Sequence, residues 1–146
     1  MPVTDFQQKN DTPIVDLTLA ALHSLANGSF ATLAEYDNSD AGNLNFVADF
    51  ELLFDGTAAP TAGNQCDLYL LVAPDGTNFT DTTGPPPNLI AGVFVMAAVD
   101  PNRLVLRDVP LPSSKFKAYF KNGAGVGTAA SGSSLKMLAR RQQGTS

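Results

Sequence analysis

The sequence predicts an all-β protein: a two-sheet antiparallel β-sandwich, jelly-roll-like in its connections, with about eight strands. In most segments apolar and polar residues alternate, which is the period of a strand with one buried face. Clusters of Gly, Pro, Asn and Asp separate these segments, and no segment has a convincing helical period. A chain of 146 residues is most simply one domain, long enough to bury about two-thirds of its unfolded surface.

The alternation places each expected strand between two turn signals. In chain order the expected strands cover residues 14–19, 29–36, 44–54, 66–72, 89–99, 103–109, 115–121 and 134–138. The first is the least distinct, because residues 17–25 also fit helical spacing; a strand is favoured because Asn27-Gly28 then forms the turn into the next one. One apolar face of each strand is expected in the core, with the contributors Phe46, Phe50, Leu68, Leu70, Val93, Val95, Leu104, Leu106, Phe116 and Phe120.

The longest apolar run, residues 89–99, is too short to span a membrane, which takes about 20 residues, and is expected to be a central strand. Phe94 and Met96 then lie on the face opposite Val93 and Val95, so both faces need cover. A neighbouring subunit is one way to supply it. We therefore expect a homo-oligomer, and analogy with proteins at three-fold lattice positions makes a trimer the preferred number.

The two ends of the chain are polar and lack periodicity. The expected organisation is an N-terminal arm over 1–12, a β-sandwich domain over 13–139 and a C-terminal tail over 140–146. The connections 55–65 and 74–88 are long for a compact domain. No signal peptide is visible at the N-terminus, so folding in the cytoplasm is expected.

Positive charge is concentrated in the last third of the chain. Residues 1–100 hold thirteen acidic groups and Lys9, a net of −12, whereas residues 101–146 hold eight basic groups and Asp108, a net of +7. A basic surface is therefore expected to contact an acidic protein partner, through Arg103, Arg107, Lys115, Lys117, Lys121, Arg140 and Arg141. Nucleic acid is disfavoured as a partner, because Tyr119 is the only aromatic residue expected among these bases.

Catalytic equipment is sparse. His23 is the only histidine and lies beside Ser24, but no nucleophile-elbow motif accompanies the pair. Asp49 and Glu51 share a strand face and resemble a carboxylate pair, although a solvated face is the better interpretation. The glycines of residues 123–127 lack the Lys-Ser/Thr of a phosphate-binding loop. We expect no enzyme activity and no catalytic residue.

No cofactor or metal site is expected either. Cys66 is the only cysteine, which excludes a Cys-rich metal site. Asp75, Asn78 and Asp81 could supply oxygen ligands to calcium, but their spacing does not match an EF-hand and such residues also stabilise turns. Whether these three bind a cation stays open at this point.

Several segments, taken in order, resemble a family of small virion structural proteins of tailed bacteriophages. They are Tyr36–Ser39, Asn43–Phe54, Asp67–Asp81, Leu104–Pro112, Phe116–Gly123 and Ala130–Met137. The resemblance implies a β-sandwich without enzymatic activity, located in the virion, and transfers no catalytic residues. It does not distinguish among the capsid surface, the head–tail connector and the tail.

Two functions follow as expectations. The preferred one is a capsid decoration or cement protein that binds the major capsid protein, with no nucleic acid or membrane partner. The alternative is a tail- or fibre-associated β-sandwich module that binds host carbohydrate. Trp is absent, and Tyr36 and Tyr69 fall on or beside strands, which weighs against a sugar site.

Overall fold

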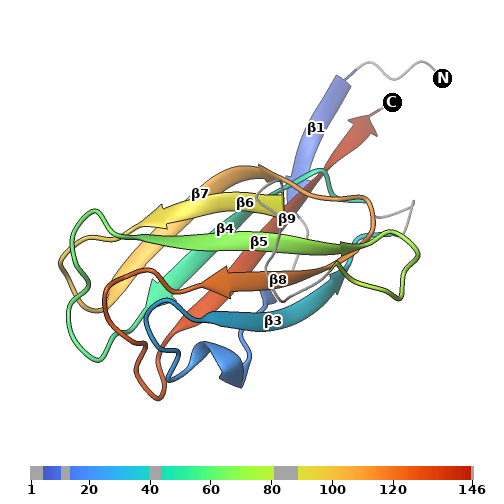
Figure 1. Ribbon diagram of the computed structural model, residues 1–146. Helices are drawn as coiled ribbons and strands as arrows, with labels where there is room; N and C mark the ends of the chain where they lie inside the picture. Colours follow the sequence, from blue (N-terminus) through green and yellow to red (C-terminus); the bar gives the residue numbers. More distant parts are fainter. Residues whose placement is uncertain (1–4, 11–13, 40–43, 81–88, 146) are drawn as a thin grey trace.

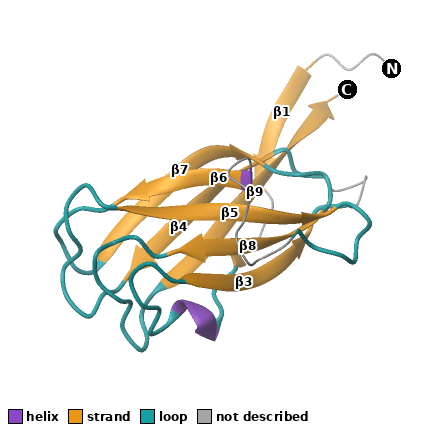
Figure 2. Ribbon diagram, in the orientation of Figure 1, coloured by secondary structure: helices purple, strands orange, loops and turns teal. Residues whose placement is uncertain are grey.

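The computed structural model describes residues 5–10, 14–39, 44–80 and 89–145, and within them nearly all regular structure is strand (Figure 2). The strands are β1 (Asp5–Asn10), β2 (Val15–Asp16), β3 (Phe30–Asp37), β4 (Val47–Phe54), β5 (Gln65–Ala73), β6 (Ile90–Val95), β7 (Asn102–Pro110), β8 (Lys115–Lys121) and β9 (Ser134–Thr145). One short 3-10 helix, η1, spans Ala20–Leu22. The expected strand over 14–19 is thus reduced to the two residues of β2, and η1 takes part of the segment whose spacing is also helical.

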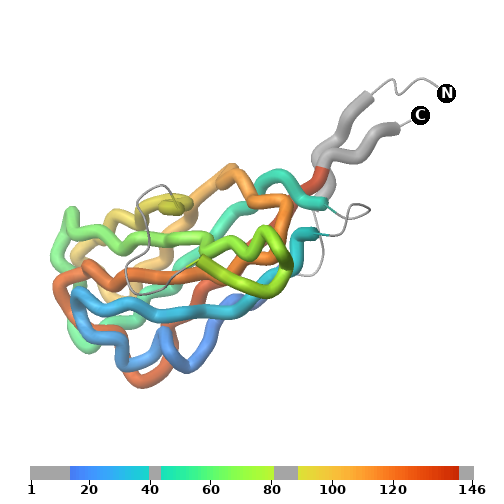
Figure 3. The backbone as a smooth tube through the Cα atoms, turned by 45° about the vertical axis from the view of Figure 1, so that its right-hand side comes forward, coloured from blue at the N-terminus to red at the C-terminus, as the bar shows by residue number. Residues whose placement is uncertain are grey.

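The strands form two antiparallel sheets that face each other (Figures 1 and 3). One sheet has the order β1-β9-β4-β7, with β2 also paired to β9, and the other has the order β3-β8-β5-β6. If β1 and β2 are counted together as the first strand, β3 becomes the second strand and β9 the eighth. In spatial order, one sheet then holds the first, eighth, third and sixth strands, and the other holds the second, seventh, fourth and fifth. This order is that of a jelly roll, so the expected fold class is confirmed.

The core lies between the sheets and is built from alternate residues of each strand, as the period of two predicts. Its largest fully buried side chains include Phe50, Phe116, Phe120 and Leu68. Leu70 is also buried, and Leu104 and Leu106 of the edge strand β7 are partly buried against the core. Phe46 was expected in the core but is 51% exposed. Phe46 is an even number of residues from Phe50 and so would point inward in a continuous strand. However, β4 begins at Val47, so Phe46 lies just outside the strand and beyond the end of the core.

The predicted face of β6 is wrong. Phe94 and Met96 are buried in the core, whereas Val95 is 53% exposed and Val93 is half-buried. Among the described strands, β6 pairs only with β5, so it is an edge strand and not a central one. Apolar residues occupy both parities of this segment, so periodicity does not distinguish its faces. The structure assigns the inner face to the larger side chains.

The ends of the chain pair with each other. β1 runs antiparallel to the last part of β9, from Asp5 opposite Thr145 to Asn10 opposite Arg140. The last strand was expected to stop at residue 138, but backbone pairing continues because β1 supplies a partner that periodicity does not reveal. We call residues 5–10 and 140–145 the terminal ribbon; in Figure 1 it extends past one end of the sandwich.

Candidate functional site

The jelly-roll order explains the charge segregation seen in the sequence. Every charged residue of β3, β4 and β5 is acidic, and every charged residue of β8 and β9 is basic. In the sheets β4 lies between β7 and β9, and β8 lies between β3 and β5. Acidic strands therefore alternate with basic ones, and opposite charges meet across neighbouring strands, where such pairs stabilise a sheet.

On the outer face of the five-stranded sheet, Arg140 of β9 pairs with Asp49 of β4. Its two terminal nitrogens donate to the two carboxylate oxygens at 2.8 and 3.0 Å. Arg140 also pairs with Asp108 of β7, so one guanidinium joins three strands. The side chain of Arg140 is only 12% exposed, which makes this a structural ion pair and not a solvent-facing charge.

The register shift between β4 and β7 gives Asp49 a further partner. Asp108 has a positive φ of 55° at this irregularity, and its backbone N–H donates to the Asp49 carboxylate at 2.9 Å. Burial by itself raises the pKa of Asp49, but hydrogen bonds from Asp108 and Arg140 and the charges of Arg140 and Arg107 outweigh it and lower the pKa overall. Asp49 is thus held ionised, without the neutral form that a general acid needs.

A shallow groove of about 180 Å³ lies on the same face, lined by Ile14, Asp49, Glu51, Val105, Lys136, Met137 and Leu138. Glu51 pairs with Arg103 at 2.6 Å across the β4–β7 ladder. Both carboxylates of the groove therefore pair with arginines, Asp49 with Arg140 and Glu51 with Arg103. Ile14 and Val105, each more than half exposed, make part of the groove apolar.

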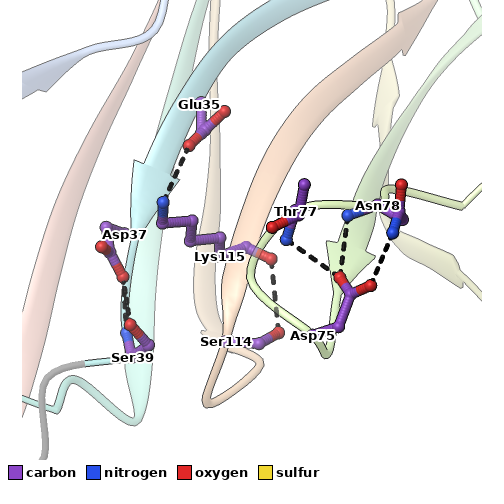
Figure 4. A network of polar contacts seen from close by, with 8 residues as sticks. All are labelled: Glu35, Asp37, Ser39, Asp75, Thr77, Asn78, Ser114 and Lys115. Atoms are coloured by element: carbon purple, nitrogen blue, oxygen red, sulfur yellow. Dashed lines mark hydrogen bonds and ion pairs between the residues drawn. The ribbon is translucent and has the colours of Figure 1, made fainter.

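On the outer face of the four-stranded sheet, the three lysines of β8 have their own neighbours. Lys115 pairs with Glu35 of β3 at 3.8 Å (Figure 4). Lys117 lies 4.2 Å from the centre of the Phe79 ring, and Lys121 lies 5.6 Å from that of Phe30.

The seven basic residues expected to contact a partner do not form one patch. Arg103, Arg107 and Arg140 lie on the outer side of the five-stranded sheet, and Lys115, Lys117 and Lys121 lie on the outer side of the other. Arg141 is in the terminal ribbon, opposite Lys9. Most of these charges already have acidic or aromatic partners within the fold.

His23 and the glycine-rich loop, the other candidate sites from the sequence, also make contacts within the fold. His23 Nε2 lies 3.2 Å from the backbone oxygen of Ser133, and no carboxylate partner for the ring occurs within the described residues. In the loop of residues 123–127, the backbone N–H groups of Ala124 and Gly125 donate to the side-chain oxygens of Asn122 and Asn27. These donors are not available for a phosphate group.

Asp75 closes the turn after β5 (Figure 4). Its carboxylate accepts hydrogen bonds from the backbone N–H groups of Thr77 and Asn78 and from the Asn78 amide, at 2.7–2.9 Å. These bonds lower the pKa of Asp75 to about 2. The described residues contain no metal-binding cluster of His, Cys, Asp or Glu; Asp81 lies outside them.

One feature was missed from the sequence: an aromatic cluster on the outer face of the four-stranded sheet. Tyr69 and Tyr119 are buried there, although Tyr119 was expected among exposed lysines. Phe30 stacks on Tyr119 with ring centres 5.1 Å apart and remains 39% exposed. The three residues come from β3, β5 and β8, so only the strand order brings them together.

The chain matches no protein-family model, and a comparison with curated proteins finds no significant relative. In the described part of the chain, no helix is long and apolar enough to cross a bilayer. Two surfaces remain as candidates for binding a partner. One is the terminal ribbon, and the other is the outer face of the four-stranded sheet, which carries the aromatic cluster.

Proposed function

We propose that the chain is a non-enzymatic virion structural protein of a tailed bacteriophage, a capsid decoration or cement protein that binds the lattice of the major capsid protein. The observation that supports this most is the terminal ribbon at one end of a jelly-roll body. Jelly rolls are frequent in viral capsid proteins, and the sequence resembles virion β-sandwiches. Because one fold hosts many functions, the proposal depends on what the ribbon can bind.

The ribbon has unpaired strand edges. β1 pairs only with β9, and β9 beyond Arg140 pairs only with β1 among the described residues. Each free edge presents backbone N–H and C=O groups to which an extended segment of a partner can add as a strand. Two strands alone are marginally stable in water, so a third strand from the capsid lattice would complete the sheet.

The engaged polar groups favour a structural role over catalysis. His23, Asp49, Glu51 and Asp75 all have partners within the fold. The proposed partners are the major capsid protein and further copies of this chain, with a trimer as the preferred oligomer. Nucleic acid, membrane and cofactor are not part of the proposal.

Electron microscopy of the intact particle tests the proposal directly. Density for a jelly roll on the outer capsid surface, with the ribbon end toward the lattice, is expected. Density at the head–tail connector or the tail would overturn the decoration role. Light scattering tests the oligomer separately, because a monomer at every accessible concentration contradicts the trimer.

A further inference from the structure

A row of three chemically different side chains crosses the outer face of the four-stranded sheet. Phe30 of β3 is opposite Lys121 of β8, and Lys121 is opposite Asp67 of β5. Their sequence neighbours Ala31, Phe120 and Leu68 are buried in the core, so the row has the outward parity. An aromatic ring, an ammonium group and a carboxylate therefore follow one another across neighbouring strands.

The ring of Phe30 is held from behind by the buried tyrosines. Phe30 stacks on Tyr119 with an interplanar angle of 10°, and Tyr69 meets Tyr119 at a T-shaped angle of 63°. Tyr69 and Tyr119 are only 7% and 6% exposed, against 39% for Phe30. The ring is thus a fixed, partly open platform that loses little side-chain entropy when a ligand stacks on it.

Neither Lys121 nor Asp67 takes part in the ion pairs found among the described residues. Within the row, Lys121 Nζ lies 5.6 Å from the centre of the Phe30 ring, so its ammonium group is next to the stacking surface. Burial, and then the charge and hydrogen bonding of the Asp67 carboxylate, raise the pKa of the Tyr69 hydroxyl. That hydroxyl remains protonated at neutral pH and can donate to Asp67, which orients the carboxylate.

We propose that Phe30, Lys121 and Asp67 form a binding subsite for one neutral hexose unit of a glycan. A pyranose ring has an apolar C–H face that packs on an aromatic side chain, and hydroxyl groups at its rim. Those hydroxyls donate to a carboxylate and accept from an ammonium group. The inference does not depend on the capsid role, because the row lies on the sandwich and not on the terminal ribbon.

The charge balance of this face selects a neutral ligand. Glu35, Asp37 and Asp67 offset Lys115, Lys117 and Lys121 on the described strands β3, β5 and β8. A polyanion such as single-stranded nucleic acid gains little from a face without net positive charge. A neutral saccharide needs no such excess, and a single stacked ring predicts weak binding in the millimolar range.

Saturation-transfer NMR on the full-length protein tests the subsite, with lactose, maltotriose and mannotriose as neutral probes and a sialylated lactose as the charged comparison. We expect saturation transfer to at least one neutral probe. In spectra of the protein, that probe should shift the backbone amide signals of residues 30, 67 and 121. Phe30→Ala should weaken binding about tenfold, the effect of one aromatic contact of about 1.4 kcal/mol. Asp67→Asn, which keeps size and shape, should also weaken it.

Phe46→Ala is the matched control, because Phe46 is a similarly exposed phenylalanine outside the row. It should leave saccharide binding unchanged. Absence of binding by every neutral probe would overturn the proposal, as would binding that tolerates both Phe30→Ala and Asp67→Asn in folded protein. A preference for the sialylated probe would contradict the neutral class.

Discussion

Arg140 and Asp49 form a two-pronged ion pair that joins the last strand to the centre of its sheet. The pair lies where β9 leaves the sandwich for the terminal ribbon, since Arg140 is opposite both Val47 and Asn10. The residue that a sequence argument assigns to an external partner thus holds the sheet together at the base of the ribbon. Two carboxylates of β4 allow this role to be measured.

Asp49→Asn should lower the free energy of unfolding by about 1–3 kcal/mol, because it weakens a hydrogen-bonded ion pair around a mostly buried guanidinium. Glu51→Gln, two residues along the same strand, should cost less than about 1 kcal/mol, because its partner Arg103 is 61% exposed. Urea denaturation at neutral pH measures both. Equal losses would mean that the burial of Arg140 adds no stability.

Asp75→Asn should produce a stability difference that depends on pH. The folded protein lowers the pKa of Asp75 from its ordinary 3.8 to about 2, so the native state favours the ionised form. The associated stability is fully present above about pH 4 and is lost as the pH falls toward 2. Thermal melts should therefore show the largest gap between parent and variant above pH 4 and a shrinking gap below it. A gap that does not change with pH would contradict the carboxylate as its cause.

The fold was predictable where one parity of a segment is apolar. Phe50 and Phe116 lie in such segments, and both are in the core. Phe94 lies in a segment where residues of both parities are apolar. Its inward face therefore depends on which residues of the other sheet pack against β6. A Cβ at Gly92 would lie 2.5 Å from Leu106 Cδ1, a close approach between strands that no local pattern reveals.

The surface was less predictable than the core. The sequence shows that acidic and basic residues lie in different thirds of the chain, but which strands become neighbours depends on the topology. Asp49 meets Arg140 across 91 positions, and Phe30 meets Tyr119 across a similar distance in the chain. Pairings of this kind are set by strand order, which the charge pattern alone does not reveal.

Phe94→Ala should cost about 3–5 kcal/mol in unfolding free energy, because it leaves a cavity in the core. Val95→Ala should cost less than about 1 kcal/mol, since this neighbouring side chain is 53% exposed. Chemical denaturation of the two variants decides which face of β6 is inward. A larger loss for Val95→Ala would mean that Val95 faces the core, as first expected from the sequence.

Cys66 should react with thiol reagents only when the protein opens. Its side chain is fully buried, and desolvation raises the pKa of the thiol to about 11, so little thiolate exists at pH 8. The rate of modification by an aromatic disulfide should rise with urea in parallel with the unfolded fraction. Rapid modification of native protein would show that β5 opens locally.

The capsid role separates into contributions from the ribbon and from the lysines. Deletion of residues 1–10 removes β1 but leaves Arg140 and its ion pairs, so the sandwich should keep its melting temperature. Capsid binding should fall sharply, because the strand that completes the ribbon is missing. Co-sedimentation with capsids that lack the protein measures this.

Changing Lys115, Lys117 and Lys121 together to Ser is the matched comparison. These lysines have partners within the chain, so their loss should reduce stability by at most about 1 kcal/mol for each exposed contact. Capsid binding by this folded variant should remain close to that of the parent at low and high salt, because contacts made by backbone hydrogen bonds are only weakly screened. If the lysine variant fails to bind and the ribbon deletion binds normally, the docking surface is the outer face of β8 and not the terminal ribbon.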